Sequence, residues 1–207
     1  MNTAVAPPAK KSFKVQMLLA RESAIIESVN RLLAEKGFEA MTVDEVAAEV
    51  GIAKASLYKH FNSKEALACA AMERAMQRAQ DFIEALPVQD APLHKLKAVT
   101  RWTMQLKLLG QMPSLPSQNS SLRATLMASP AYMDGLMLVS DVLGGWIEEA
   151  QAHGEINQQL PAVAVLYTLY ARACDPVLEF LKMGNELTDE AVLDIVMSSC
   201  FEGLQAR

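Results

Sequence analysis

The fold is decided by residues 42–67, which read TVDEVAAEVGIAKASLYKHFNSKEAL. Thr42, followed three residues later by Glu45, forms a capping box, in which each side chain binds a free backbone amide at the start of a helix. Valine and alanine then recur at helical spacing up to position 50, which predicts a short helix with one apolar stripe. Gly51 ends that helix, and a second short helix is expected over Lys54–Phe61. Two short helices joined by a glycine turn form a helix-turn-helix.

The second of these helices is predicted to have two faces. Leu57 and Phe61 are four residues apart and are expected to pack on the apolar stripe of the first helix. The opposite face combines small side chains with hydrogen-bond donors, a combination that can approach base edges in a major groove. The predicted base-reading residues are Ala55, Ser56, Lys59 and His60. The predicted phosphate-binding residues, at the sides of the groove and at helix starts, are Thr42, Lys54, Tyr58 and Lys64.

The charge of the chain is unevenly distributed. The 207 residues carry a formal charge of -5, whereas residues 1–64 hold 9 Lys and Arg against 7 Asp and Glu. Any contact with a polyanion is therefore expected in the N-terminal quarter. Ordinary surface helices also carry lysines, so charge alone does not identify a DNA-binding helix. The glycine turn, the capping box and the two-faced helix together favour DNA binding.

The rest of the chain has helical patterns almost throughout, which predicts an all-α fold with about nine helices. A flexible arm is expected over residues 1–20, and the first helix is expected to end near Lys36, before Gly37. Further helices are predicted over residues 63–86, 90–109, 121–128, 129–153, 161–183 and 188–204, with a proline- and serine-rich loop over 110–121. Pro176 is expected to kink or interrupt the penultimate helix.

The composition indicates a soluble, cytoplasmic protein. It is 51% apolar and 21% charged, as globular proteins are, and no apolar run is long enough to span a membrane. The cysteines, Cys69, Cys174 and Cys200, are far apart and odd in number, which fits a reducing compartment. Each cysteine is expected to be a small buried apolar residue, with a redox-sensing thiol as the alternative.

Residues 21–68 resemble the DNA-binding domain of the TetR family of bacterial transcriptional regulators. The matching stretch is LLAEKGFEAMTVDEVAAEVGIAKASLYKHFNSKEAL, with Gly-Phe, Val-Ala, Gly-Ile and Leu-Tyr-Lys-His-Phe in the family's order. Ala53 departs from the pattern, because the family usually has a serine there that caps the recognition helix. Loss of that cap is expected to cost about 1 kcal/mol of local stability.

The resemblance implies a homodimer whose recognition helices enter successive major grooves of a near-palindromic operator, roughly 34–36 Å apart. It implies a DNA-binding domain over residues 21–67 and an effector-binding and dimerisation domain over residues 68–207. The last two helices are then the expected dimer interface, because they carry more apolar surface than one side of a core can hide. Filling of the core of one chain is the alternative. The candidate interface residues are Leu166, Tyr167, Leu178, Val192, Ile195, Val196 and Ser199.

The middle helices are rich in methionine and tryptophan, which suits an adaptable site for an apolar guest. The candidate effector-site residues are Trp102, Met104, Met127, Met133, Met137, Trp146 and Tyr170. Taken singly, each is more often a core residue. Three arginines on otherwise apolar helices, Arg101, Arg123 and Arg172, are able to pair either with an anionic effector or with acidic residues of the chain itself.

These patterns predict a ligand-responsive DNA-binding regulator, most simply a repressor that a small, largely apolar effector releases from DNA. An activator fits the sequence equally well. A helical-bundle enzyme is the first alternative, but His60, His94 and His153 are isolated and no nucleophile motif or phosphate loop is present. No catalytic residue, metal or cofactor is therefore predicted. A nucleoid-type protein that coats DNA without sequence preference is the second alternative, and it needs a larger basic surface.

Overall fold

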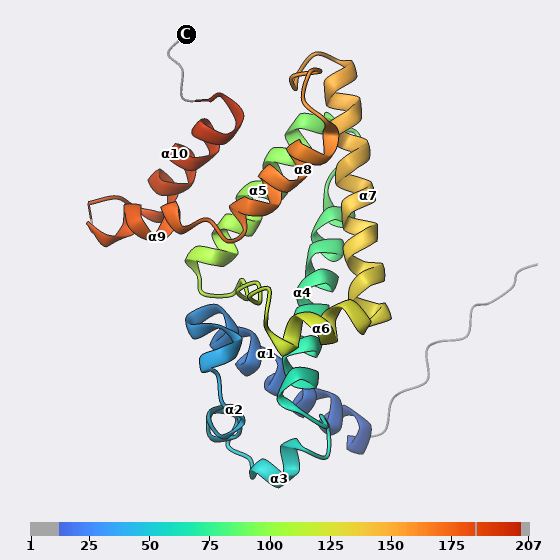
Figure 1. The fold of residues 1–207 in the computed structure, drawn as a ribbon, viewed down its shortest axis with the longest axis vertical. Helices are drawn as coiled ribbons and strands as arrows, with labels where there is room; N and C mark the ends of the chain where they lie inside the picture. Colours follow the sequence, from blue (N-terminus) through green and yellow to red (C-terminus); the bar gives the residue numbers. More distant parts are fainter. Residues whose placement is uncertain (1–12, 185, 204–207) are drawn as a thin grey trace, which may run out of the picture.

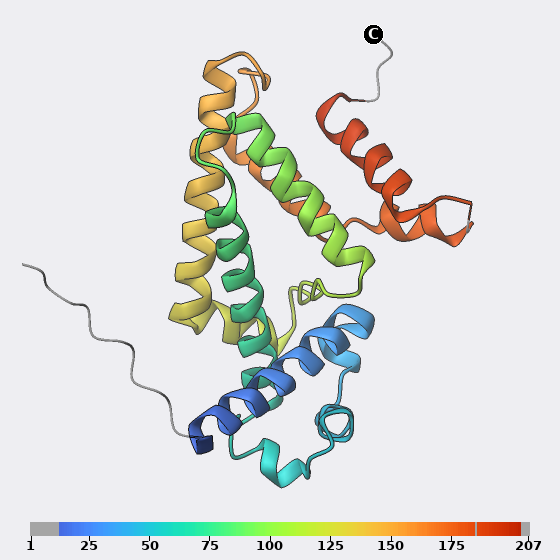
Figure 2. The same ribbon diagram turned by 180° about the vertical axis from the view of Figure 1, so that it is seen from behind.

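The computed structural model describes residues 13–184 and 186–203, which are helical with connecting loops and contain no strand. Figures 1 and 2 show α1–α3 at one end of the molecule, with α4 leading from them into a body built from α5, α7 and α8. The helices are α1 (Phe13–Ala40), α2 (Val43–Val50), α3 (Lys54–Leu57), α4 (Lys64–Ala85), α5 (Pro92–Leu108), α6 (Ser121–Ala128), α7 (Pro130–Ala152), α8 (Ala162–Arg172), α9 (Pro176–Met183) and α10 (Asp189–Phe201). The predicted all-α fold is confirmed. In the part of the chain that is described, no helix is both long enough and apolar enough to cross a membrane.

The first helix starts earlier than the sequence indicated. Residues 1–12 of the predicted arm lie outside the described residues, whereas residues 13–20 form the first turns of α1. Toward its other end, Gly37 has φ 76°, and the chain kinks there. This left-handed conformation favours glycine, which is why the regular part of α1 ends at the predicted position.

The recognition helix is shorter than predicted. Only Lys54–Leu57 forms α3, and the residues up to Phe61 continue in hydrogen-bonded turns. Ala53 provides no side-chain cap, and Ser63 already caps the next helix by accepting a hydrogen bond from the amide of Ala66 at 3.0 Å. α3 begins at the predicted Lys54, so its C-terminal end is what is shorter, and turns connect Leu57 to the cap of α4 at Ser63.

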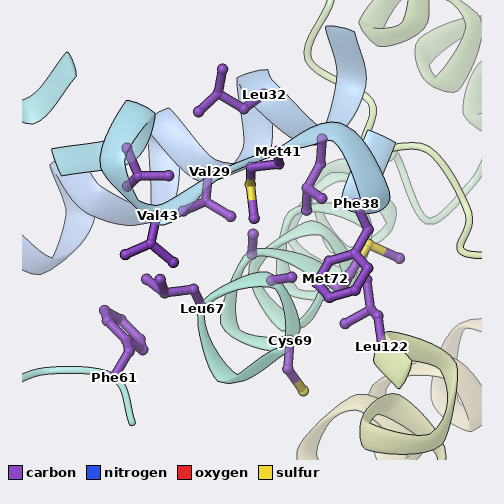
Figure 3. Close-up of a cluster of buried hydrophobic side chains, with 14 of the residues drawn as sticks. Val29, Leu32, Phe38, Met41, Val43, Phe61, Leu67, Cys69, Met72 and Leu122 are labelled. Carbon is purple, nitrogen blue, oxygen red and sulfur yellow. The ribbon is translucent and has the colours of Figure 1, made fainter. Parts of the chain in front are cut away.

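The helix-turn-helix shares its core with the body. We call this set the N-terminal core cluster: it joins buried side chains of α1–α4, including Val29, Val46 and Leu57, to Leu122 of α6 and Tyr132 of α7. Figure 3 shows Leu122 reaching toward side chains of the first helices from below. Burial of α4 continues past residue 67 through Ala68, Ala71 and Met72, so α4 crosses the predicted domain boundary without interruption.

Two further clusters hold the body together. The second core cluster joins α4, α5, α7 and α8, with Leu96, Leu143 and Ile147 at its centre. The C-terminal core cluster, Met104, Leu178, Val192, Leu193 and Val196, joins α5 to α9 and α10. The predicted penultimate helix is interrupted at Pro176, where the Asp175 carboxylate caps α9 by accepting a hydrogen bond from the Val177 amide at 3.0 Å. The break at Pro176 is thus as predicted.

Candidate DNA-binding surface and ligand cavity

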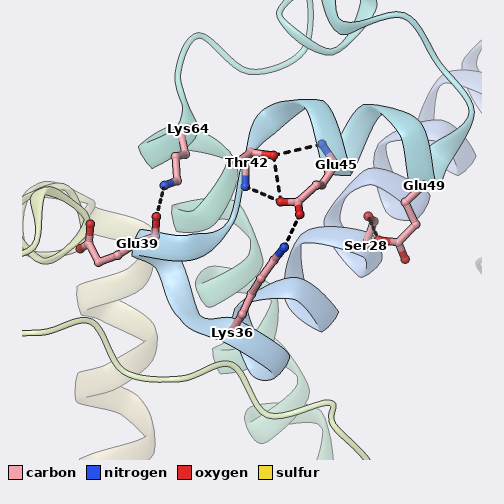
Figure 4. Close-up of polar contacts among 7 residues, drawn as sticks. All are labelled: Ser28, Lys36, Glu39, Thr42, Glu45, Glu49 and Lys64. Atoms are coloured by element: carbon pink, nitrogen blue, oxygen red, sulfur yellow. Dashed lines mark hydrogen bonds and ion pairs between the residues drawn. The ribbon is translucent and has the colours of Figure 1, made fainter.

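The first helix of the helix-turn-helix begins with the predicted capping box. The Thr42 amide donates to Glu45 Oε2 at 2.9 Å, and the Glu45 amide donates to Thr42 Oγ1 at 3.3 Å (Figure 4). Lys36 of α1 also binds the Glu45 carboxylate. The hydrogen bond from Lys36 and those from Thr42 lower the pKa of Glu45 to about 2, so this carboxylate is charged at neutral pH. At the other end of α2, Gly51 ends the helix with φ 71°.

We call α3 and the turns that follow it, residues 54–61, the turn-helix segment. This segment has one buried and one exposed side. Leu57 is fully buried and Phe61 is 9% exposed, both in the N-terminal core cluster. On the other side Ala55 and Lys59 are exposed, while Ser56 and His60 are half-buried. The predicted base-reading residues therefore lie away from the anchor Leu57, which is the arrangement that a groove-reading helix needs.

The four predicted phosphate-binding residues already have neighbours within the chain. Lys54 Nζ binds Asp44 Oδ2 at 2.8 Å. Lys64 Nζ donates to the Glu39 carbonyl at 3.3 Å and lies 4.3 Å from the centre of the Phe38 ring. The Thr42 hydroxyl is used in the capping box (Figure 4). Tyr58 is 42% exposed.

Each acidic side chain of α2 is paired with a base. Asp44 pairs with Lys54, Glu45 with Lys36, and Glu49 with Arg31 of α1. Glu49 also accepts a hydrogen bond from Ser28 at 2.9 Å. Exposed ion pairs contribute little to stability. Here they pair the acids next to the exposed side of α3 with bases, whereas Lys59 has no acidic partner among the described residues.

A cavity of about 580 Å³ lies in the body, within the size range of sites that bind small organic molecules. Its wall is formed by α4, α5, α6, α7, α8 and the loop between α5 and α6. Of the candidate effector-site residues, Trp102, Met127 and Tyr170 line it. Trp102 stacks on Phe82, with ring centroids 4.6 Å apart.

The other four candidates do not line this cavity. Met104 is fully buried in the C-terminal core cluster, and Met133 packs against the N-terminal core cluster. Met137 is 55% exposed, and Trp146 packs against the second core cluster. The cause is the rotational phase of α7: the face that lines the cavity carries Tyr132, Leu136, Val139, Ser140 and Leu143. Methionines one position from this face point elsewhere.

Among the polar groups of the cavity wall, the sequence candidates included Tyr170 and Arg123 but missed Ser140 and Arg78. Ser140 and Tyr170 are hydrogen-bonded at 2.8 Å, and burial raises the pKa of the Tyr170 hydroxyl. Arg78 of α4 donates to Gln111 Oε1 at 3.5 Å. Arg78 lies next to Ala75, Met76 and Ala79, which line the cavity from α4. In the sequence, this apolar stripe was the only feature that pointed to α4 as part of the cavity wall.

The three arginines singled out in the sequence have different surroundings. Arg101 binds Asp194 at 2.8 Å and also pairs with Glu190. Arg172 binds Asp175 at 2.6 Å. Both therefore have partners inside the chain. Arg123 lines the cavity and has no acidic partner among the described residues.

The candidate interface residues divide between core and surface. Leu178, Val192 and Val196 are buried in the C-terminal core cluster, so they hold α9 and α10 onto α5 within one chain. Leu166 lines the cavity, and the Ser199 hydroxyl donates to a backbone carbonyl of its own helix at 2.9 Å. Tyr167 and Ile195 are 66% and 46% exposed and are the two that present an apolar surface.

The cysteines form no bond with one another, because all three are free thiols. Burial raises the pKa of Cys69 to about 11, and burial also raises the pKa of Cys200. A thiol with a raised pKa holds its proton at neutral pH and reacts slowly. No group of three or more metal-binding side chains lies together within residues 13–184 and 186–203.

Together, the exposed face of α3, its buried anchor and the all-helical body define a helix-turn-helix transcriptional regulator. Residues 25–71 match the family model described as bacterial regulatory proteins of the tetR family. The DNA-binding end of the chain is therefore of the TetR type of bacterial transcriptional regulators. Proteins of this family are regulators and not enzymes, so the enzyme alternative is excluded.

Two regulators from Bacillus subtilis are similar in sequence. YdeS, an uncharacterized HTH-type transcriptional regulator, is 27% identical over 195 residues, which cover 88% of this chain and 89% of YdeS. YerO, also an uncharacterized HTH-type transcriptional regulator, is 49% identical over 53 residues, which cover 26% of this chain and only 18% of YerO. The chain thus aligns with nearly all of YdeS but with less than a fifth of YerO.

Two solved structures have a similar fold. The fatty acid degradation regulator FadR from Bacillus halodurans has a TM-score of 0.68 at 21% identity, covering 96% of this chain and 100% of FadR. AibR in complex with isovaleryl coenzyme A and operator DNA has a TM-score of 0.65 at 21% identity, covering 87% of this chain and 98% of AibR. At these identities the likeness establishes the arrangement of helices.

Proposed function

We propose that this regulator binds a near-palindromic operator as a homodimer and releases it when a small, largely apolar effector fills the cavity. In this proposal residues 21–67 bind DNA, and residues 68–207 bind the effector and dimerise. The observation that carries it is the continuity of α4. The helix starts at its cap Ser63, beside the helix-turn-helix, and runs unbroken to the cavity wall at Met72 and Met76. A shift of α4 by a bound effector therefore moves the helix-turn-helix.

A second connection supports the same proposal. The loop between α5 and α6, part of the cavity wall, is hydrogen-bonded to α1: Asn30 Nδ2 donates to the Gln111 carbonyl at 2.8 Å, and the Ser114 amide donates to the Leu33 carbonyl at 3.3 Å. The side chain of Gln111 is in turn the partner of Arg78 in the cavity. A guest that displaces this loop pulls on α1 directly.

The contact with DNA follows from the exposed side of the turn-helix segment. In our proposal Ala55, Ser56, Lys59 and His60 face the bases, and Tyr58, Lys54, Lys64 and the start of α2 at Thr42 face phosphates. Lys54 exchanges its exposed ion pair with Asp44 for phosphate oxygens, which costs little because such pairs are worth at most about 1 kcal/mol in water. Lys64 exchanges its hydrogen bond to the Glu39 carbonyl in the same way.

A homodimer is supported by the apolar surface of the last three helices. Six large apolar side chains there are exposed: Val163, Tyr167, Val177, Phe180, Met183 and Ile195. Large apolar side chains that are exposed on neighbouring helices often mark a surface that a partner chain covers. We propose these residues, with Tyr167 and Ile195 kept from the sequence prediction, as the interface.

The regulator proposal is tested by selecting binding sites from random duplex DNA and measuring affinity by fluorescence anisotropy. We expect a two-fold symmetric site with half-sites about one turn apart, bound far more tightly than random duplex at physiological salt. If the selected site and random duplex are bound with equal affinity, and both affinities fall equally as the salt concentration rises, the nucleoid-type alternative is supported instead. By linkage, an effector must weaken operator binding by the factor by which operator weakens effector binding. An effector that leaves operator affinity unchanged contradicts the repressor mechanism.

The route of transmission has its own test. Asn30→Ala removes one of the two hydrogen bonds that tie the loop to α1, and such a bond contributes about 1 kcal/mol. We expect the variant to bind the operator normally while the effector weakens that binding less than in the unmodified protein. An unchanged effector response shows that α4 alone transmits the signal.

A further inference from the structure

We propose that the effector is an anionic amphiphile, whose apolar chain lies in the cavity and whose carboxylate or phosphate head is held by Arg78 and Arg123. This inference rests on the proposed function for the word effector, whereas the binding itself does not depend on it. It names the chemistry of the guest, which the size of the cavity alone leaves open.

The charge of the cavity wall is opposite to that of the protein. The chain has 24 acidic and 19 basic residues, yet the wall contains no Asp, Glu, Lys or His, and its charged side chains are Arg78 and Arg123. Neither has an acidic partner among the described residues. By contrast, Arg31, Arg101 and Arg172 each bind a carboxylate of the chain. An acidic protein thus keeps two guanidinium groups without counter-ions at one cavity.

Arg78 in particular lacks a strong partner. Burial, and then the nearby charge of Arg74, lowers the pKa of Arg78, which means that the folded chain disfavours this cation. Its hydrogen bond to Gln111 is 3.5 Å long, at the weak end of the range. A guanidinium carries five donors in a planar fork that fits two oxygens of a carboxylate or phosphate. An anionic head therefore supplies what Arg78 is missing.

Other polar groups in the wall are already used. The hydroxyls of Thr100 and Thr103 each donate to a backbone carbonyl at 2.8 Å. Ser140 is bonded to Tyr170. Ser140 also donates to the Leu136 carbonyl at 2.7 Å, so none of these hydroxyls has a free proton to offer an anionic head, although each can still accept a hydrogen bond. The charged donors that remain for an anion are those of the arginines.

The wall has a polar and an apolar part. Gln111, Leu115, Arg123 and Met127, on the α5–α6 loop and α6, are exposed, so the cavity opens to solvent on that side. On α5, α7 and α8 the wall includes buried aliphatic side chains, as at Leu96, Leu143 and Leu169. A guest with its head at the opening and its chain inside matches both parts, because the chain gains from leaving water and the head stays close to it.

The test compares guests that share a chain and differ in the head: dodecanoate, dodecan-1-ol and dodecanoyl coenzyme A. Binding is followed by the fluorescence of Trp102, which lines the cavity, in a Trp146→Phe background that leaves it as the single tryptophan. We expect dodecanoate or the thioester to bind about tenfold or more tightly than the alcohol, the preference that one charge-assisted hydrogen bond provides. Which of the two anions binds more tightly identifies the source of the head group. If the alcohol binds as tightly as both anions, the inference is wrong.

Variants locate the head. Arg78→Gln and Arg123→Gln are each expected to remove most of the preference for the anions while leaving the affinity for the alcohol unchanged. Arg74→Gln is the matched control, because it removes the same charge one turn away on α4, outside the cavity wall. Equal losses in the control and in Arg78→Gln mean long-range attraction and overturn the assigned contacts. Arg78→Lys keeps a cation, so retained preference there shows that a loss in Arg78→Gln is not misfolding.

Operator affinity, measured in the same samples, separates the two proposals. If the anions bind through the arginines and the operator is not released, the inference stands and the repressor mechanism fails. If the alcohol releases the operator as well as the anions do, the repressor mechanism stands and the inference fails.

Discussion

Leu57→Ala is the sharpest test of how α3 is anchored to the rest of the protein. Leu57 is the buried residue of α3 and is fully enclosed in the N-terminal core cluster. The substitution removes three carbons, which corresponds to about 2.5 kcal/mol at roughly 0.8 kcal/mol per methylene. The void adds to this, because α1, α2 and α4 are fixed by other contacts and collapse only partly, so the total reaches about 3–4 kcal/mol.

The free energy of unfolding is measured by urea denaturation at one fixed protein concentration, because a dimer's stability depends on concentration. Operator affinity is measured on the same protein by anisotropy. Leu138→Ala, at a site on α7 that is 48% exposed, is the control and is expected to cost less than about 1 kcal/mol. The reasoning is refuted if Leu57→Ala costs no more than Leu138→Ala, or if its operator affinity stays unchanged.

Three further predictions concern the bases, the capping box and the dimer. Lys59→Ala should relax base preference by about 1–3 kcal/mol at one position, whereas Lys64→Ala should weaken binding to all sequences alike; affinities for a panel of altered operators decide, and no change in either variant refutes the assigned faces. Because the folded-state pKa of Glu45 is depressed to about 2 from 4.5, its stabilisation is present above pH 4.5 and lost as the pH falls toward 2. Urea midpoints across this range should therefore fall more steeply for the unmodified protein than for Glu45→Gln, and parallel curves contradict the capping role. Phe180→Asp should yield monomers in sedimentation, while Val88→Asp, at an apolar side chain that is 89% exposed but outside α8–α10, should not; two dimeric variants rule out the proposed interface.

The helix-turn-helix was predictable because its signals are local. The capping box at Thr42, the stripe on α2 and the stop at Gly51 each depend on residues within one or two turns, and all three appear in the structure. The length of α3 was overestimated at its C-terminal end, because the spacing of Leu57 and Phe61 also fits the hydrogen-bonded turns that follow the helix. The kink at Gly37 and the break before Pro176 follow from the backbone preferences of single residues.

The cavity was predictable only as a region, because long-range packing decides which face of each helix lines it. Methionine content led to Met133 and Met137, but α7 turns Leu136 and Val139 toward the cavity instead. Arg78 gave no signal of its own, since its significance depends on the absence of an acid nearby in space.

The last two helices show the same limit of composition. An apolar side chain on a terminal helix fits a partner chain or the helix's own chain equally well. Leu178 and Val192 bind α9 and α10 to Met104 of α5, and only the opposite faces of these helices, as at Phe180, remain exposed. The core of one chain buries one face of each helix, so only the exposed face is available for contact with a partner chain.

The insertion of Leu122 and Tyr132 among the side chains of α1–α4 limits how this protein can be recombined with its relatives. A hybrid regulator that takes residues up to 67 from this protein and the rest from a relative lacks Leu122 and Tyr132. Its junction also divides α4 at the buried Ala68. A junction near the end of α4 keeps α4 whole. If α6 and the first turn of α7 are exchanged as well, the transplanted helix-turn-helix keeps all the side chains of the N-terminal core cluster.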